Sequence, residues 1–315
     1  MYSRLKIFAG NANKSLATEV AKFAGTPLSE ADVFKFSNDN TFVKINENVR
    51  GADCYIIQPT SSPVNDNLME LLIMVDALKR ASAERVNCVI PYFAYARSDK
   101  KDQPRVPITA KLIADLITTA GADRVITLDL HSGQIQGFFN IPVDHLTSMP
   151  IFARYFKENL DLENTVVVSP DSGGTHRARE LAARLDCALA IGDKRRAGND
   201  DNAEILNIIG DVTDKNALLF DDIIDTGGSI TRIAGTLKKK GAKKVYAACS
   251  HGILSGKAIE NLNNSPIEKL FITDSIPLTP EKKKCKKLKQ LSIAELLAIV
   301  IKKIHINESI SILFR

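Results

Sequence analysis

The sequence predicts an α/β protein of two similar domains, each a mainly parallel sheet flanked by helices. Short β-branched runs alternate with longer helical patterns, which is typical of a parallel sheet covered by helices on both faces. The length of 315 residues exceeds what one hydrophobic core usually serves. Residues 109–131 also align without gaps on residues 229–251, with identities at six positions. We therefore expect a duplicated unit, with ligands bound in a crevice between the two copies.

The individual elements follow from local patterns. Short apolar runs predict strands at residues 6–8, 54–58, 86–91, 124–128, 165–169, 188–191, 217–220 and 245–249. Residues 66–80 predict a helix, because apolar side chains recur there at three- and four-residue steps and form one stripe. Residues 33–36 and 41–45 predict a small strand pair, a β-flap at the edge of the first domain.

A polar turn at residues 147–150 predicts the domain boundary. The first domain then comprises residues 1–147 and includes the flap, and the second comprises residues 148–315. Residues 291–301 have helical periodicity interrupted by Ser292 and Glu295, so they predict a core-packed helix and not a membrane span. We expect the extreme C-terminal helix to pack back on the N-terminal domain.

Composition argues against several classes of protein. The formal charge is +5, and the six lysines between residues 282 and 289 predict a solvated loop. Tryptophan is absent and aromatic residues make up 6% of the chain, so we expect no nucleic-acid partner. No run of 18 apolar residues occurs, so we expect no membrane partner. The five cysteines form no CxxC pair and are expected to be reduced, which fits a cytoplasmic protein.

The strongest local signal is the run LLFDDIIDTGGSI, which has the pattern of a strand, a turn and a helix. Gly227 and Gly228 allow the backbone to close around a phosphate, and the hydroxyls of Thr226 and Ser229 add hydrogen bonds. The N-terminus of the following helix favours an anion in the same place. The alternative is that Asp-Thr-Gly merely caps the helix.

Two carboxylates, Asp221 and Asp222, follow a strand that is expected to end at Phe220. A phosphate bound at the turn would repel them, so they are expected to contact hydroxyls or a metal ion instead. A sugar phosphate has both the hydroxyls that the acids need and the phosphate that the turn needs.

A second glycine turn, VVVSPDSGG, follows another apolar strand. The amides of Gly173 and Gly174 are suited to a diphosphate, and Asp171 is placed to hold Mg²⁺. A plain tight turn is the alternative. His131 follows the strand in VITLDLHS, but a lone histidine is more often a packed or surface residue, so its role depends on its neighbours.

Two basic stretches, YARSDKKD and GDKRR, complete the inventory. Both stretches could be exposed charged loops. The alternative for Lys194, Arg195 and Arg196 is a loop that closes over a triphosphate and neutralises its charge. The chain contains no GxxxxGK[ST], no GxGxxG after a strand, no GxSxG and no HExxH. Phosphate chemistry therefore depends on the two glycine turns, which we expect to face each other across an interdomain cleft.

Together these motifs resemble ribose-phosphate pyrophosphokinases of the phosphate-activated class over essentially the whole chain. The resemblance also rests on FAGNAN, SPVNDNLMELLIMVDALKRASA, PYFAYARSDKKD, TLDLHSGQIQGFFNIPVDHL, SPDSGG, DKRR and ESISILF. It implies two phosphoribosyltransferase-like domains. The implied reaction transfers the β,γ-pyrophosphoryl group of MgATP to the 1-hydroxyl of ribose 5-phosphate, which gives 5-phosphoribosyl 1-pyrophosphate and AMP for nucleotide, histidine and tryptophan biosynthesis.

The resemblance also implies roles for individual residues. Ribose 5-phosphate would be bound by Asp221, Asp222, Asp225, Thr226, Gly227, Gly228 and Ser229. The Mg²⁺ on the ATP phosphates would be held by His131 and Asp171, and the catalytic residues would be Lys194 and Arg196. ATP would be bound by Phe36 of a neighbouring subunit and by Asn38, Asn40, Arg97, Ser98, Asp99, Lys100, Asp102 and His131.

Assembly and regulation are implied in the same way. The resemblance predicts a homo-oligomer, a hexamer, with phosphate and ADP as effectors at a site that includes Ser309 and Ser311. Two stretches depart from the family pattern. Asn38, Asp39 and Asn40 stand where Asp-Gly-Glu is usual, and Ser98 stands where Gln is frequent. We expect altered adenine contacts and not lost activity, because donors and acceptors remain.

Two alternatives remain open. A non-catalytic regulatory homologue would have the same fold, but it would be expected to lose Lys194, Arg196, Asp171 or His131, and all four are present. A phosphoribosyltransferase would consume the activated sugar and would share only the DTGGS region.

Overall fold

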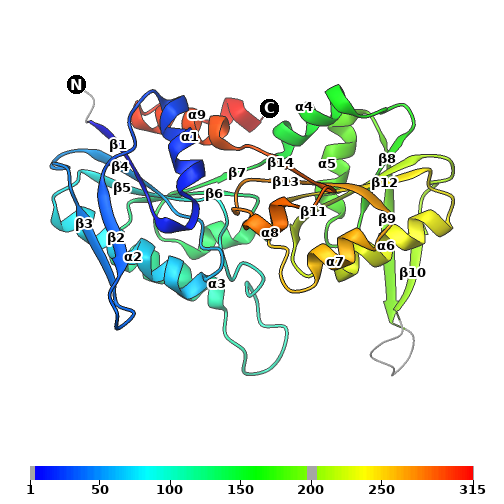
Figure 1. Cartoon of the computed structure of the whole chain (residues 1–315), viewed down its shortest axis with the longest axis horizontal. Helices are drawn as coiled ribbons and strands as arrows, with labels where there is room; N and C mark the ends of the chain where they lie inside the picture. The colour runs from blue at the N-terminus through cyan, green and yellow to red at the C-terminus, as the bar shows by residue number, and fades with distance from the viewer. Residues whose placement is uncertain (1–3, 197–203, 315) are drawn as a thin grey trace. The chain divides into compact units, whose positions relative to one another are not determined.

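The structure is a computed structural model that describes residues 4–196 and 204–314. The chain folds into two compact units (Figure 1). The first unit comprises Met1–Thr147, Ser275–Pro277 and Ser292–Arg315, and the second comprises Ser148–Asp274 and Leu278–Leu291. Each unit contains a mainly parallel sheet with helices on both faces. The predicted fold class is therefore confirmed.

The first unit has a five-stranded parallel sheet. Its order is β1 (Leu5–Ala9), β4 (Asp53–Ile57), β5 (Arg85–Ile90), β6 (Arg124–Leu128) and β7 (Val143–Leu146). Helices α2 (Val64–Arg80) and α3 (Thr109–Ala120) cover one face and pack on alternate strand residues such as Cys54 and Ile56. Helices α1 (Lys14–Ala24) and α9 (Ala294–His305) pack together on the other side of the sheet (Figure 1).

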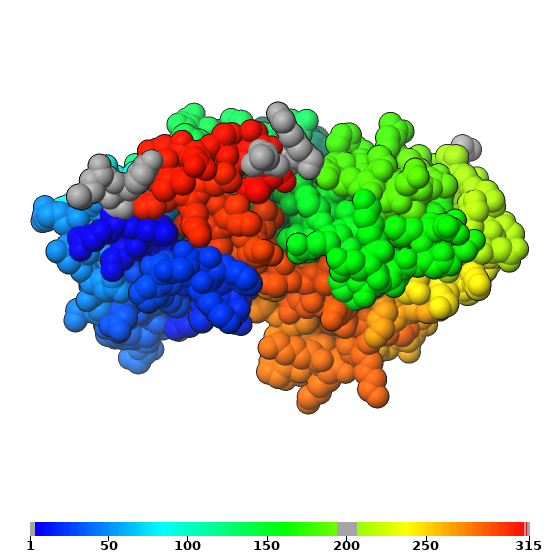
Figure 2. All heavy atoms as spheres, turned by 90° about the horizontal axis from the view of Figure 1, so that it is seen from above, coloured from blue at the N-terminus to red at the C-terminus, as the bar shows by residue number. Residues whose placement is uncertain are grey.

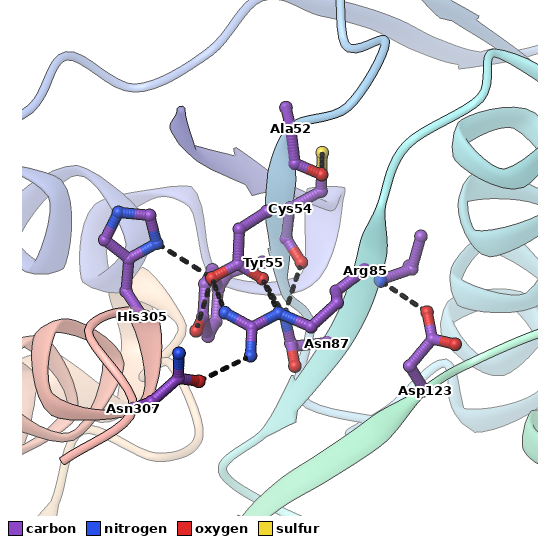
Figure 3. A network of polar contacts seen from close by, with 10 residues as sticks. Ala52, Cys54, Tyr55, Arg85, Asn87, Asp123, His305 and Asn307 are labelled. Carbon is purple, nitrogen blue, oxygen red and sulfur yellow. Dashed lines mark hydrogen bonds and ion pairs between the residues drawn. The ribbon is translucent and has the colours of Figure 1, made fainter. Parts of the chain in front are cut away.

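The C-terminal part of the chain is fixed to this sheet through a buried carboxylate. Asp53 is completely buried, and it accepts hydrogen bonds from Arg85 at 2.6 and 3.0 Å and from Asn87 at 2.9 Å. His305 of α9 lies 2.8 Å from the same carboxylate, and Asn307 accepts a hydrogen bond from Arg85 at 3.2 Å (Figure 3). Residues from the start of the chain and from α9 lie side by side on the surface (Figure 2).

A two-stranded hairpin of β2 (Ala31–Lys35) and β3 (Thr41–Ile45) packs on α2. Its inner side chains Val33, Val43 and Ile45 join the core on that face. Short 3₁₀ helices η1 (Asn11–Asn13), η2 (Gly133–Phe138) and η3 (Ser311–Phe314) complete the unit.

The second unit has a seven-stranded sheet in which each described pair of neighbours is parallel except β9 and β10. The order is β10 (Glu204–Ile209), β9 (Ala188–Arg196), β8 (Thr165–Ser169), β11 (Asn216–Ile224), β12 (Lys244–Gly252), β13 (Ile267–Thr273) and β14 (Leu288–Leu291). Helices α4 (Met149–Asn159) and α5 (Thr175–Leu185) cover one face. Helices α6 (Gly228–Lys239) and α7 (Ala258–Asn263) cover the other, and α8 (Pro280–Lys283) precedes β14.

The internal repeat corresponds to one helix–glycine–strand arrangement that occurs in both units, α3–β6 and α6–β12. Gly121 and Gly241 follow the two helices with φ of 107° and 90°, a region that favours glycine. Val125 and Val245 are completely buried in the strands that follow. The identities at these positions therefore serve helix termination and core packing.

Four strands were not predicted: β7, β10, β13 and β14. Two of them, β10 and β14, are edge strands that carry polar side chains such as Asn207 and Lys289, so they lack a continuous apolar run. The lysine run is only in part the expected solvated loop. Lys282 and Lys283 belong to α8 and Lys289 belongs to β14, whereas the other three lysines lie between these elements. Exposed positions are Lys283, Lys284, Lys286 and Lys289.

The remaining general expectations concern thiols and membranes. All five cysteines are free, and four of them are buried. In the ranges that the structure describes, no helix has both the length and the apolarity to cross a bilayer.

Candidate active site

The two predicted glycine turns lie at the same edge of the second unit's sheet. Strands β8 and β11 are parallel neighbours, with Val168 paired to Leu219, so their carboxyl ends meet. A Cβ atom placed on Gly174 would lie 3.8 Å from Asp171 Oδ1 and 3.9 Å from Asp221 Oδ1. The expectation that the turns face each other across an interdomain cleft is therefore wrong, because both belong to one unit and are joined by neighbouring strands.

The second glycine turn, at residues 171–174, is organised by Asp171. Its Oδ1 accepts a hydrogen bond from the Gly174 amide at 3.0 Å, and its carbonyl accepts one from Ser169 Oγ at 2.7 Å. Helix α5 begins directly afterwards with Gly174 as its N-cap, and no side chain of the described residues caps it. The carboxylate of Asp171 therefore lies beside a helix N-terminus, the combination that a metal-bound polyphosphate needs.

The acid pair lies inside a strand and not after it. Strand β11 continues past Phe220 because β12 runs beside it, with Asp221 paired to Cys249 and Ile224 to Gly252. The expected strand end at Phe220 is thus wrong. Asp222 is 3% exposed whereas the Asp221 side chain is 25% exposed, so only Asp221 of the pair has a solvent-accessible carboxylate.

Arg177 of α5 neutralises part of this charge. Its Nη2 lies 2.8 Å from Asp222 Oδ1 and 3.4 Å from Asp221 Oδ1. Burial, together with the hydrogen bond and the charge of Asp222, raises the pKa of Asp221 from 3.8 to about 7, although Arg177 and the Asp222 amide act in the opposite direction. Asp221 therefore keeps its proton to higher pH than an ordinary carboxyl group, and a positive charge or hydroxyl donors beside it would favour its ionised form.

The DTGGS turn connects β11 to α6. Gly227 has a φ of 75° and is the N-cap of α6, without a side-chain cap among the described residues. Asp225 lies two residues before this N-cap, and its Oδ1 accepts a hydrogen bond from Ser255 Oγ. Thr226 and Ser229 are exposed, and the amides of the first turn of α6 have no acceptor within the helix. Unpaired amides and exposed hydroxyls at one turn are suited to binding an anion.

The flap presents aromatic side chains to solvent. Phe36 is 50% exposed and Phe34 is 46% exposed, and the rings of these two residues and Phe42 lie within 5.5 Å of one another. Asn38 Oδ1 accepts a hydrogen bond from the Asn40 amide at 3.2 Å, so the Asn38 side chain stabilises the turn itself. An exposed aromatic cluster at the tip of a hairpin is suited to stacking on a flat ring system.

The loop between β5 and α3 carries the other predicted ATP residues. Arg97, Lys100 and Asp102 are exposed, and Ser98 and Asp99 are half-buried. The Ser98 backbone connects the loop to its surroundings, since its amide donates to the Tyr95 carbonyl at 2.8 Å and its carbonyl accepts from Ala110 at 3.2 Å.

The remaining predicted residues are located as follows. His131 is half-buried, three residues after β6 in the first unit. Ser309 and Ser311 are exposed, and their hydroxyl oxygens lie 2.8 Å apart. The backbones of Lys194 and Arg196 belong to β9, but their side chains are outside the described part of the structure. In the described ranges, no group of three or more His, Cys, Asp and Glu side chains is arranged to hold a metal ion.

Three residues of the site were not found from the sequence: Arg177, Ser255 and Asn261. Arg177 follows the second glycine turn by three residues, and a basic residue in the first turn of the helix was a usable signal. Ser255 and Asn261 contact the DTGGS turn from a segment about 30 residues further along the chain, and no local pattern marks them.

Comparison with known proteins adds to this geometry. A family model described as the N-terminal domain of ribose phosphate pyrophosphokinase matches residues 5–121, and one described as a phosphoribosyl synthetase-associated domain matches residues 199–315. The ribose-phosphate pyrophosphokinase of Bacillus subtilis is 55% identical over 310 residues, which are 98% of this chain and 97% of that protein. That of Clostridium perfringens is 55% identical over 313 residues, 99% and 98% of the two chains.

A solved structure agrees with these sequence matches. The phosphoribosylpyrophosphate synthetase from Mycobacterium smegmatis superimposes with a TM-score of 0.92 at 42% identity, covering 97% of this chain and 100% of that one.

Proposed function

Because the chain belongs to the ribose-phosphate pyrophosphokinase family, we propose that it transfers the β,γ-pyrophosphoryl group of ATP to the 1-hydroxyl of ribose 5-phosphate. The products are 5-phosphoribosyl 1-pyrophosphate, which serves nucleotide, histidine and tryptophan biosynthesis, and AMP. The observation that carries the proposal is the shared edge of β8 and β11, where the Asp171 turn, the acid pair and the DTGGS turn lie together.

Ribose 5-phosphate would bind at the DTGGS turn. The first-turn amides of α6 and the exposed hydroxyls of Thr226 and Ser229 would hold its phosphate. Asp221, which is partly exposed, precedes the turn in β11 and would accept hydrogen bonds from the ribose hydroxyls, and the buried Asp222 would support it through their shared contact with Arg177. This arrangement separates the negative phosphate from the negative side chains along the length of the sugar.

The donor set fits Mg²⁺. This ion is usually held by one or two carboxylates and by substrate phosphates, so a cage of three protein groups is not required. The Asp171 carboxylate lies at the carboxyl end of β8, close to Asp221, and His131 is assigned to the same ion by the family resemblance. When bound with ATP, Mg²⁺ would neutralise phosphate charge. We assign the ATP-binding part to residues 1–147 and the ribose-phosphate part to residues 148–315.

Transfer would proceed by in-line attack of the anomeric oxygen on the β-phosphorus, with AMP as the leaving group. Loose phosphoryl transition states need positioning and charge neutralisation and little covalent help. Lys194 and Arg196 at the end of β9 would supply positive charge as the bond between the α-oxygen and the β-phosphorus breaks. No nucleophilic side chain is required.

Adenine binding would involve the flap and the loop after β5. Phe36 of a neighbouring subunit would stack on one face of the base and Arg97 on the other, with Asn38, Asn40, Ser98, Asp99, Lys100 and Asp102 nearby. This requires a homo-oligomer, for which we propose a hexamer. Phosphate and ADP would act as effectors at a site that includes Ser309 and Ser311, and we expect the enzyme to work in the cytoplasm.

The test is a direct assay. The purified protein is incubated with ATP, MgCl₂, ribose 5-phosphate and inorganic phosphate, and AMP is followed by chromatography. AMP that forms only when ribose 5-phosphate is present supports the proposal. Absence of AMP with retained binding of ATP would identify a non-catalytic homologue, and base transfer that releases pyrophosphate would identify a phosphoribosyltransferase.

A further inference from the structure

Residues 253–265 follow β12 and contact three consecutive residues of the DTGGS turn, Asp225, Thr226 and Gly227. We call residues 253–265 the supporting segment. Ser255 makes two contacts with Asp225: its Oγ donates to Oδ1, and its amide donates to the carbonyl at 3.0 Å. Asn261 Nδ2 donates to the Thr226 carbonyl, also at 3.0 Å. Two neighbouring residues of the turn are therefore each held by a different side chain of this segment.

Backbone packing continues the same contact at the next residue. A Cβ atom placed on Gly227 would lie 3.6 Å from both Cα and the carbonyl oxygen of Ala258. Ala258 is itself 1% exposed and belongs to the core under α6. The turn therefore packs against the start of α7 at Gly227. The positive φ of Gly227 sets the direction of the first amides of α6.

The supporting segment is fixed at both ends by lysines from the run that precedes and enters β14. Lys282 Nζ donates to the Ile253 carbonyl at 2.9 Å. Lys287 Nζ donates to the carbonyls of Leu262, Asn263 and Ser265 at 3.0, 3.1 and 2.8 Å. An ammonium group has three donors, and the last carbonyls of a helix lack partners within it, so Lys287 gives a partner to the last two carbonyls of α7. The segment is thus an ordered support, although it carries no predicted ligand contact.

We propose that Ser255 and Asn261 are positioning residues for ribose 5-phosphate. They contact the turn through Asp225 Oδ1 and the Thr226 carbonyl, and they leave the Thr226 and Ser229 hydroxyls exposed toward solvent. They fix the backbone from which the phosphate is bound, and they make no predicted contact with ATP. The proposal rests on the function proposed above, in that the DTGGS turn binds the sugar phosphate.

The experiment compares kinetic constants of four variants in the full-length oligomer. Ser255→Ala and Asn261→Ala each remove one hydrogen bond, so we expect the KM for ribose 5-phosphate to rise about fivefold while the KM for ATP stays unchanged. Asn261→Asp replaces the donor by an acceptor that faces the Thr226 carbonyl, so it should raise the same constant about tenfold. Ser255→Thr keeps the hydroxyl and should restore a value close to the wild type.

Asn264→Ala is the matched control, because Asn264 is exposed on the same segment and its side chain makes no hydrogen bond within the described residues. Calorimetric binding of ribose 5-phosphate alone gives a second readout that is independent of turnover, and Tm reports global damage. Unchanged ribose-phosphate constants, or equal rises in both KM values with a lowered Tm, would overturn the inference. A wild type that neither binds ribose 5-phosphate nor forms AMP would instead overturn the proposed function itself.

Discussion

Individual charged side chains set the charge balance of the candidate site. Arg177 contacts both acids of the pair, Asp171 lies beside the same edge, and Asp221 is only partly covered. Each of these residues carries charge at the carboxyl end of the sheet. Substitutions here should therefore alter binding, rate and pH dependence more than they alter folding.

Lys194→Ala should lower kcat by at least about a hundredfold, as for other lost contacts to transition-state charge. The ribose-phosphate and ATP binding constants should change much less, because the charge is needed mainly as the bond breaks. Steady-state kinetics and substrate binding by calorimetry measure the two effects separately. Lys284→Ala, an exposed lysine of the run before β14, is the control. An unchanged turnover would show that the β9 lysine is not catalytic.

Asp221→Asn should change the pH dependence of stability. The pKa of Asp221 is about 7 in the folded protein against an ordinary value of 3.8, so the unfolded chain releases this proton at lower pH. The folded state consequently loses stability as pH rises from about 4 to about 7, where the wild type must ionise a buried acid. Asparagine does not titrate, so the difference between the Tm of the variant and the Tm of the wild type should increase as pH rises from about 4 to about 7.

Thermal unfolding at a series of pH values measures this gain. Glu158→Gln, at an exposed position on α4, is the control and should keep a constant difference from the wild type. A constant difference for Asp221→Asn as well would mean that the acid ionises normally in the folded protein.

At the scale of elements, the apolar patterns predicted what lies in the core, and the motifs predicted where the two glycine turns lie. The runs at residues 124–128 and 165–169 form β6 and β8 with the same bounds, and the helix over α2 and the β2–β3 hairpin are present. The failures involve distance along the chain. Arg177 meets Asp222 across 45 residues, and His305 meets Asp53 across 252. Such pairs depend on which strands become neighbours, and no local pattern contains that information.

The attachment of α9 to the first sheet gives a prediction about stability. Asp53→Asn leaves the Arg85 guanidinium without its charge partner and weakens the contact with His305, so the free energy of unfolding should fall by about 3 kcal/mol. Chemical denaturation monitored by circular dichroism measures this change. Asp76→Asn is the matched control, because its ion pair with Arg80 is exposed and should be worth less than about 1 kcal/mol. Equal losses in the two variants would contradict the assigned role of Asp53.

At the scale of the whole molecule, the proposed assembly makes each active site depend on two chains. Phe36 sits on a hairpin at the surface of the first unit, and it would complete the adenine site of a neighbour. A chain that carries a defective flap and a chain that carries a defective β9 lysine would then lack different parts of different sites. Mixed assemblies should contain sites with neither defect.

Co-expression of Phe36→Ala with Lys194→Ala should therefore restore AMP formation that neither variant supports by itself. The restored site combines the intact lysine of the first chain with the intact phenylalanine of the second. Differently tagged chains allow the mixed oligomers to be purified before assay. The control pairs Phe36→Ala with the double variant, which supplies no intact Phe36 and should restore nothing. A fully active monomer would remove the assignment of Phe36 to a neighbouring site.

The inclusion of Ser292–Arg315 in the first unit affects how this protein is made. During translation, α1 and the strand that carries Asp53 leave the ribosome long before α9 has been synthesised. Until then, the apolar stripe of α1 that includes Leu16 and Val20 has no α9 to pack on, and Asp53 has no His305. The nascent N-terminal half must therefore wait, with only α1 on this side of its sheet, while the second unit is produced. Apolar surface that stays exposed during this interval is prone to aggregation.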